Sequence, residues 1–308
     1  MSESAVSVQH LSKTFGTHAV LQDVSFEVPA GQTFALLGRN GAGKTTTIRA
    51  LLGLLPPDGG QIRIAGCDPA RDPLELRRRV GYLAEDQSMY GWMTPVELCR
   101  FLAPFYPRWN AALANQYLDR FELPRQVRIE RLSKGQSVKL GLAVALAHEP
   151  QVAILDDPAL GLDPISRKEF YRDLVEHLQA EGRTVIYSSH LLAEVEAVAD
   201  AVAILDRGRI VRHGATEVLR SEVQRLILPV AVARRRSPPT GLLDVRRQGD
   251  QLEIVIDGME PFIDELTAAG LSPQPSTMTL DDIFEAFVIG RPQDWPTDES
   301  PSGASVVA

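Results

Sequence analysis

A glycine-rich octapeptide carries the clearest chemical potential in this sequence. It reads Gly38-Arg39-Asn40-Gly41-Ala42-Gly43-Lys44-Thr45 and fits the pattern G-x-x-x-x-G-K-[ST]. Because glycines lack a Cβ, the backbone N–H groups of such a loop can turn inward around a phosphate, and a following helix points its positive end at the same anion. Lys44 offers a charge to the β- and γ-phosphates, and Thr45 offers a hydroxyl to Mg²⁺. The loop predicts a nucleotide site, but kinases, GTPases and ATPases all share it.

The flanking residues predict the elements that position this loop. Residues 6–11 and 19–28 alternate apolar and polar side chains, as half-buried antiparallel strands do. Thr33–Leu37 is a continuous apolar run, which is typical of a buried parallel strand, and a helix follows from about Gly43 to Leu54. Further strands are predicted at 61–65, 80–84, 152–155, 184–187 and 202–205, with helices at about 164–181 and 191–199. This alternation predicts an α/β fold with right-handed crossovers, and a chance glycine-rich turn would lack that context.

Three further regions follow from the periodicity. From Thr94 to Ala147 the pattern is helical, so we expect a helical subdomain at about 94–147, inserted into a first domain of residues 1–222. Residues 223–290 are predicted to form a small α+β domain, with strands at 242–246 and 252–256 and helices near 260–269 and 280–289. Residues 291–308 are rich in Pro, Ser and Asp, which predicts a disordered tail.

Composition excludes several classes of protein. The 308 residues carry a net charge of −8, so no nucleic-acid partner is expected, and the run Arg234-Arg235-Arg236 is interpreted as a solvated linker flank. Only Cys67 and Cys99 are present, which favours a reducing compartment and structural roles for both thiols. The start of the chain does not resemble a signal peptide, and no run approaches the roughly 18–20 apolar residues of a membrane span. Any span must therefore come from another subunit.

Several further motifs carry a resemblance to a known family. Leu132-Ser133-Lys134-Gly135-Gln136 resembles the signature usually written LSGGQ, with Lys in the third position. Val152–Asp156 resembles a Walker B strand, and Ala159-Leu160-Gly161-Leu162-Asp163-Pro164 resembles a D-loop. With the phosphate-binding loop, these motifs make residues 5–220 similar to the nucleotide-binding domain of ABC transporters. The implied fold is a P-loop NTPase with an ABC-type ATPase core, N-terminal antiparallel strands and an inserted helical subdomain, plus the small C-terminal α+β domain.

The resemblance implies a role for each site residue. One copy of the chain would bind ATP through Phe15 stacked on adenine and through Gly38, Asn40, Gly41, Ala42, Gly43, Lys44, Thr45 and Thr46. The other copy would close the site with Ser133, Gly135, Gln136 and the interfacial Asp163, where Ser133 is the expected N-cap of the helix running to Ala147. Thr45, Asp156 and Glu85 would bind Mg²⁺, and Asp157, His190 and Glu85 would be catalytic, His190 as the switch histidine at the γ-phosphate. The alternative for Phe15 is a core aromatic. A lone histidine is more often structural, but His190 follows a buried strand at the expected distance.

Two positions depart from the family pattern. The general base after Walker B is normally Glu, and here it is Asp157, whose side chain is one methylene shorter. A shortfall of about 1 Å can cost roughly a hundredfold in rate, so slow hydrolysis is expected. The Q-loop normally carries Gln, and here Glu85 has that register, with Gln87 as the alternative.

The resemblance also implies the setting of the chain. One phosphate-binding loop and one signature favour a transporter subunit over tandem translation factors, and the short spacing between them excludes an inserted coiled coil. The run Thr277-Met278-Thr279-Leu280-Asp281-Asp282-Ile283-Phe284 resembles the end of drug- and antibiotic-exporting members, which favours export. Expected partners are a separate transmembrane permease, docked near Glu85–Met93 with Trp92 and Met93 in the groove or in the local core, and a second nucleotide-binding subunit, identical or different. The expected location is the cytoplasmic face of the cell membrane. The alternative is a slow or regulatory ABC ATPase associated with translation or repair.

Overall fold

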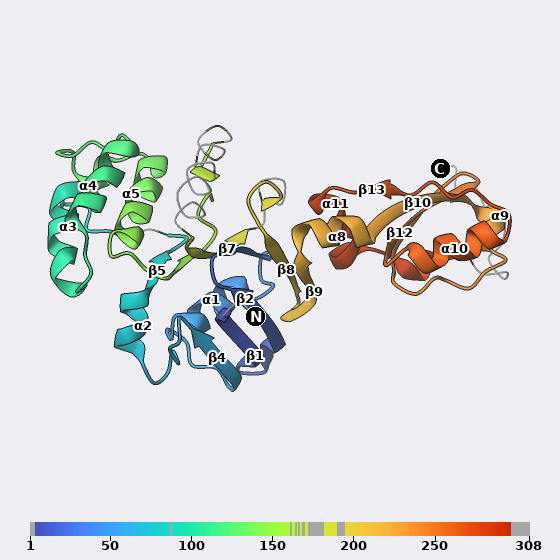
Figure 1. Cartoon of the computed structure of the whole chain (residues 1–308), viewed down its shortest axis with the longest axis horizontal. Coiled ribbons are helices and arrows are strands. Elements are labelled where there is room, and N and C mark those ends of the chain that lie inside the picture. Colours follow the sequence, from blue (N-terminus) through green and yellow to red (C-terminus); the bar gives the residue numbers. More distant parts are fainter. Residues whose placement is uncertain are drawn as a thin grey trace. The chain divides into compact units, whose positions relative to one another are not determined.

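The computed structural model describes residues 4–86, 88–160, 162–163, 165, 167, 170–171, 182–189 and 195–296. The chain divides into two compact units, Met1–His213 and Gly214–Ala308 (Figure 1). This division precedes the boundary at 222/223 that the composition predicts, because helix α8 (Thr216–Glu222) packs on strand β10 (Val223–Pro229) of the second unit.

A six-stranded sheet forms the centre of the first unit. Its order is β5 (Val80–Leu83), β6 (Val152–Leu155), β7 (Thr184–Ser189), β3 (Thr33–Leu37), β8 (Ala201–Asp206) and β9 (Arg209–Ala215). The five strands from β5 to β8 pair in parallel, as the sequence predicts. Every residue of β3, β6 and β7 is buried, which explains their continuous apolar runs. Strand β9, which the sequence analysis missed, alternates between exposed and half-buried residues at the sheet edge.

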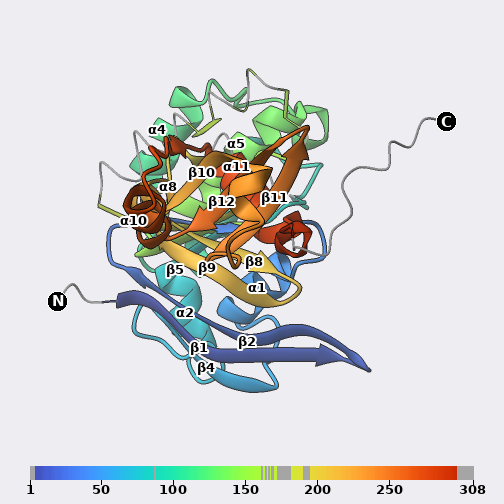
Figure 2. The same ribbon diagram turned by 90° about the vertical axis from the view of Figure 1, so that its right-hand side faces the viewer.

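A second, antiparallel sheet of the first unit has the order β2 (His18–Pro29), β1 (Ser4–Phe15) and β4 (Gly59–Ile64), side by side in Figure 2. The rings of Phe26 on β2 and Phe34 on β3 stack at 5.2 Å in one hydrophobic core shared by the two sheets. Helix α1 (Lys44–Leu51) ends earlier than predicted, because Gly53 at φ 66° turns the chain where a Cβ would lie 2.7 Å from the carbonyl oxygen of Pro69.

The predicted helical subdomain contains three helices, which lie together in Figure 1: α3 (Pro95–Leu102), α4 (Ala111–Arg120) and α5 (Lys134–Leu146). Thr94, Asn110 and Ser133 are their N-caps, each accepting a hydrogen bond from a backbone N–H of the first turn. Short 3₁₀ turns lie at Ala103–Phe105 and Ile129–Arg131, and Pro104 is within the first of them. A further helix, α2 (Pro73–Arg79), precedes β5 and was not predicted.

The second unit is an antiparallel sheet with helices. The sheet order is β11 (Leu242–Gln248), β12 (Gln251–Asp257), β10 and β13 (Ser276–Thr277), and the helices are α8, α9 (Val230–Ala233), α10 (Glu260–Ala268) and α11 (Leu280–Ile289). The strands predicted at 242–246 and 252–256 are confirmed, and they pair as the β11–β12 hairpin, with Gly249 in its turn at φ 63°. Within the described residues of the whole chain, no helix has the length and apolarity needed to cross a membrane.

Two expectations about this unit are wrong. The arginine run 234–236 follows α9 inside the unit rather than flanking a linker, and Arg236 forms an ion pair with Glu265 at 3.2 Å. The start of the predicted disordered tail is structured as well. Pro292–Asp294 forms a 3₁₀ turn, and Trp295 is buried with its ring 6.3 Å from Phe262 and its Nε1 donating to the carbonyl of Arg236.

Candidate functional site

The glycine-rich loop connects the carboxyl end of β3 to the start of α1. Gly43, the N-cap of α1, has φ 113°, a conformation that side-chain-bearing residues rarely adopt. A Cβ there would lie 2.7 Å from Leu21 Cδ2, and a Cβ at Gly38 would lie 2.7 Å from the carbonyl oxygen of Leu205. The fold therefore requires glycine at both positions, and the loop keeps a backbone surface free of side chains.

Lys44 is the first residue of α1 and is buried, with only 7% of its surface exposed. Its ammonium donates to the carbonyl oxygen of Gly38 at 2.7 Å and to that of Arg39 at 3.4 Å. Burial lowers the pKa of Lys44, although the carboxylates of Asp157, Asp156 and Glu85 act in the opposite direction. The charge is therefore held against the loop, within reach of three carboxylates.

A hydrogen-bonded cluster at the ends of β6 and β7 adjoins this loop. Asp156 is 1% exposed, and its Oδ1 accepts from Ser188 Oγ at 2.7 Å and from Thr45 Oγ1 at 3.4 Å. Burial raises the pKa of Asp156, and the donations from Ser188 and Thr45 partly offset that rise. The two predicted magnesium ligands Thr45 and Asp156 thus lie together.

Ser188 is a residue that the sequence analysis did not assign. Besides donating to Asp156, its Oγ accepts from the backbone N–H of Asp157 at 2.8 Å. That contact holds Asp157 in the left-handed region at φ 44°, where Asp is better tolerated than longer side chains. The only available signal was its position at the end of a buried strand, since β6 and β7 pair through Leu155 and Tyr187.

The donor set fits a magnesium ion. A threonine hydroxyl and a carboxylate are hard oxygen ligands, which Mg²⁺ prefers, and it takes few protein ligands beside phosphates and water. Glu85 is exposed, but its charge acts on Lys44 and on Tyr82, whose pKa burial raises to about 12. The structure thus brings Lys44, Thr45, Asp156, Asp157 and Glu85 into one electrostatic neighbourhood.

The signature motif forms the start of α5, as predicted. Ser133 is its N-cap and exchanges two hydrogen bonds with Gln136: Ser133 Oγ accepts from Gln136 N at 3.2 Å, and Gln136 Oε1 accepts from Ser133 N at 3.0 Å. Within the part of the chain that the structure describes, a Cβ at Gly135 would meet nothing closer than Leu162 Cδ2 at 3.7 Å. Packing against these residues therefore does not require glycine at 135. Among the described residues, no hydrogen bond joins this helix start to the glycine-rich loop.

The remaining predicted residues are distributed around the loop. Asn40 and Gly41 are exposed, Ala42 is buried and Thr46 is half-buried. Phe15 is 50% exposed at the end of β1, so its interpretation as a core aromatic is wrong. Asp163 is exposed and its Oδ1 accepts from Ile165 N at 3.0 Å. His190, Gln87, Gly161 and Pro164 lie outside the described residues.

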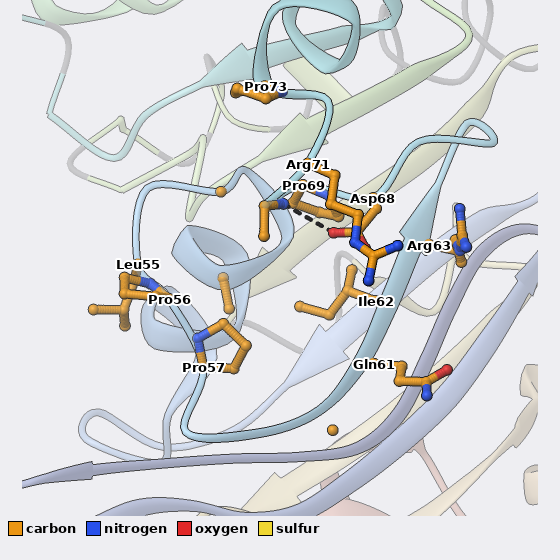
Figure 3. Close-up of a pocket in the computed structure, with 14 residues that line it drawn as sticks. Leu55, Pro56, Pro57, Gln61, Ile62, Arg63, Asp68, Pro69, Arg71 and Pro73 are labelled. Carbon is orange, nitrogen blue, oxygen red and sulfur yellow. Dashed lines mark hydrogen bonds and ion pairs between the residues drawn. The ribbon is translucent and has the colours of Figure 1, made fainter.

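A cavity of about 610 Å³ opens between the end of α1 and β4 (Figure 3). It is bordered by Leu55, Pro56 and Pro57 on one side and by Asp68, Pro69 and Arg71 on the other. None of the predicted nucleotide ligands lines it, so this cavity is distinct from the candidate site.

The chain has the fold of a P-loop NTPase. A strand, a glycine-rich loop and a helix follow one another, and they hold a buried lysine beside a threonine and an aspartate. The family model described as ABC transporter matches residues 21–160. The chain belongs to the ABC transporter ATP-binding proteins and is an ATP-binding subunit of that family, which carries ATPase activity.

Individual relatives agree with this assignment. An uncharacterized ABC transporter ATP-binding protein of Methanocaldococcus jannaschii is 35% identical over 217 residues, which are 69% of this chain and 78% of the relative. The daunorubicin resistance ATP-binding protein DrrA3 of Streptomyces coeruleorubidus is 34% identical over 227 residues, 72% of each chain. A solved structure of the ATP binding subunit of an ABC transporter has 33% identity and a TM-score of 0.64, and the match covers 70% of this chain and 92% of that one.

Proposed function

We propose that this chain hydrolyses MgATP between two head-to-tail copies and thereby drives export of antibiotic-like molecules through a separate membrane-embedded permease. One observation carries the proposal. The glycine-rich loop and the capped start of α5 each look like half of a phosphate site, and no contact with the described residues of its own chain requires the glycine at 135. A close approach of a second copy's ATP supplies a reason for that glycine. Twofold symmetry would then form two equal sites.

Each residue of the proposed site has a role that its environment supports. The loop amides from Gly38 to Thr46 and the ammonium of Lys44 would bind the triphosphate, and the exposed ring of Phe15 would stack on adenine. Thr45 and Asp156 would hold Mg²⁺ with help from Glu85, and the ion would supply charge neutralisation of the phosphates. Asp157 would orient the attacking water, and His190 would contact the γ-phosphate. Asp163 would lie at the interface of the two copies.

An exposed aromatic surface is the proposed docking site of the permease. The ring centroid of Tyr90 lies 6.0 Å from that of Trp92 and 5.3 Å from that of Phe101, and the ring centroids of Phe101 and Phe105 lie 5.6 Å apart. These four rings are between 40% and 63% exposed. Met93 is buried, which agrees with the local core, one of the two places expected for it, and not with the groove. Contiguous exposed rings of this kind mark protein interaction sites. Because the surface follows Glu85 in the chain, a permease helix docked on it would be coupled to the nucleotide site through this segment. Docking would place the chain on the cytoplasmic face of the membrane.

Export is supported by a relative named for daunorubicin resistance and by the C-terminal unit. In that unit the motif resembling exporters forms the start of α11, where Thr279 Oγ1 accepts from Asp282 N at 3.2 Å. The alternative of a regulatory ATPase associated with translation or repair is not favoured, because the relative from Methanocaldococcus jannaschii is named as an ABC transporter ATP-binding protein.

A mixing experiment tests the shared site. Lys44→Ala damages the loop half and Ser133→Arg damages the signature half, so each variant alone should lose ATPase activity. In an equimolar mixture half of the dimers are mixed, and each mixed dimer has one intact site, so about a quarter of the native activity should return. Wild-type chain diluted twofold with buffer is the control for concentration effects. A mixture no more active than its components would contradict the head-to-tail site for two identical chains.

A further inference from the structure

We infer that Asp58 is a positioning residue for base recognition, whose carboxylate acts with Lys13 to hold the exposed ring of Phe15 where an adenine can stack on it. The inference rests on the stacking role proposed above for Phe15. It starts from the way in which β1 extends past its neighbour β4.

Strand β1 has a partner on only one side over its last three residues. Its pairing with β4 ends at Ser12 and Gly59, whereas its pairing with β2 continues to Phe15 and His18. The segment 13–15 is therefore a strand end whose backbone groups lack a second strand. The side chain of Asp58 substitutes for that strand, because its Oδ2 accepts from Thr14 N at 2.7 Å while its own N–H donates to the carbonyl of Ser12 at 2.9 Å.

The second oxygen of the same carboxylate fixes a lysine beside the ring. Asp58 Oδ1 accepts from Lys13 Nζ at 2.8 Å, and that ammonium also donates to the carbonyl oxygen of Pro56 at 2.7 Å. The ammonium lies 5.6 Å from the centroid of the Phe15 ring, within the range of a cation–π contact. The hydrogen bond from Lys13, followed by that from Thr14, lowers the pKa of Asp58, so the carboxylate is charged at neutral pH.

The turn that carries Asp58 is itself restricted. Pro56 and Pro57 precede it, and their rings border the cavity between α1 and β4 (Figure 3). Because proline fixes φ, this turn has few alternative conformations, and Asp58 is presented to β1 from a rigid support. The turn fixes Asp58, and Asp58 in turn fixes the backbone of Thr14 and the ammonium of Lys13. Phe15 is positioned by its neighbour Thr14 in the strand and by the ammonium over its ring.

This arrangement matters because packing alone does not order the ring. Phe15 is half exposed, and an unsupported exposed ring would lose rotamer freedom when a base stacks on it. Holding the ring before binding removes part of that cost. Lys13 is engaged by Asp58, Pro56 and the ring, and only 13% of its side chain is exposed. It therefore is not a phosphate ligand, and the contribution of Asp58 should concern the base alone.

Calorimetric titration of the full chain with ATP and with inorganic tripolyphosphate, both in EDTA, tests the inference. Asp58→Ala should weaken ATP binding about fivefold, because the variant loses part, not all, of the affinity that a stacked base contributes. Tripolyphosphate affinity should stay within about twofold of native, because that ligand has no base. Asp23→Ala is the matched control. Asp23 is another exposed carboxylate of this sheet, bound to His10 Nδ1 at 2.6 Å, and its loss should change neither affinity.

Combination with Phe15→Ala separates positioning from a general structural effect. If Asp58 acts through the ring, Asp58→Ala should have no further effect on ATP affinity in the Phe15→Ala background. Additive losses, an equal loss of tripolyphosphate affinity, or unchanged ATP affinity in Asp58→Ala would overturn the inference. Unchanged ATP affinity in Phe15→Ala would remove the stacking role and this inference with it, while leaving the phosphate site to be judged by Lys44→Ala.

Discussion

Removal of the Ser188 hydroxyl perturbs the candidate site at its best-defined hydrogen bonds. Ser188→Ala deletes the 2.7 Å donation to the buried carboxylate of Asp156 and the 2.8 Å acceptor that fixes the N–H of Asp157. What remains on Asp156 Oδ1 is the longer contact with Thr45 at 3.4 Å. The variant therefore changes the support of both carboxylates without altering either one.

The expected magnitude follows from these contacts. A hydrogen bond to a charged group contributes about 1.5–3 kcal/mol, and a buried group left without its partner costs a similar amount. If that support is also lost in the transition state, kcat should fall about 10- to 100-fold, since about 1.4 kcal/mol corresponds to a factor of ten. Ser188 lowers the pKa of Asp156, so its removal raises that pKa. The variant should therefore lose activity at a higher pH than the native protein on the acid side of the profile.

Steady-state ATPase assays at saturating Mg²⁺ across pH, together with urea unfolding, measure both effects. Tyr187→Phe is the matched control, because it removes one buried hydroxyl from the same strand that donates to the carbonyl of Val195 at 3.5 Å, whereas the hydroxyl of Ser188 donates to Asp156. It should cost about 1 kcal/mol of stability and leave kcat and the acid limb unchanged. Native kcat in Ser188→Ala, or an equal loss in Tyr187→Phe, would refute the role of Ser188 in catalysis.

Three further outcomes are expected. Asp157→Asn should nearly abolish turnover, and Asp157→Glu should equal or exceed the native kcat because the longer side chain reaches the water; an active Asn variant would remove Asp157 from the chemistry. Gly43→Ala should lose ATP binding and should lower the free energy of unfolding in urea more than Gly41→Ala does. A Cβ at 43 would lie 2.7 Å from Leu21 Cδ2, whereas no atom of the described residues lies within 4 Å of a Cβ at 41. Equal losses of stability would contradict the packing argument. The pKa of Lys44 is lowered, so the folded chain binds fewer protons than the unfolded chain between that pKa and 10.5, and nucleotide-free stability should rise with pH in that window. ATP affinity should fall as pH rises over the same window, because the phosphates favour the charged lysine. Urea unfolding and ATP titration across pH measure the two trends, and both should be missing from Lys44→Met.

The strands around the phosphate-binding loop were predictable because their physics is local. Residues of β3, β6 and β7 are buried on both faces, so they read as apolar runs without regard to their partners. The caps of α5 were equally predictable, because Ser133 and Gln136 satisfy each other within four residues. Local patterns thus located the loop, the signature and the carboxylate strand.

Features that depend on distant contacts were not predictable. Helix α1 stops at Leu51 because Gly53 packs against the backbone of Pro69. Strand β10, which the sequence analysis did not predict, ends at Pro229 and pairs with β12 and β13, which come later in the chain. Trp295 is ordered by Arg236 and Phe262, which lie far away in the sequence. No window of the sequence contains these pairs.

The candidate site is where the chain departs most from the ordinary rules of folding. Lys44 is buried although burial disfavours its charge, Asp156 is buried with a raised pKa, and Asp157 has a positive φ. Each departure costs stability, and composition gives no hint of any of them, because the same residues on a surface would read identically in the sequence. Three such costs in one hydrogen-bonded neighbourhood persist only if function requires them, since a chain under no such demand would lose them by single substitutions. The same reasoning applies to Glu85, whose negative charge acts on Lys44 together with those of Asp156 and Asp157. Under the proposed function, a divalent cation bound with the nucleotide would offset the sum of these charges.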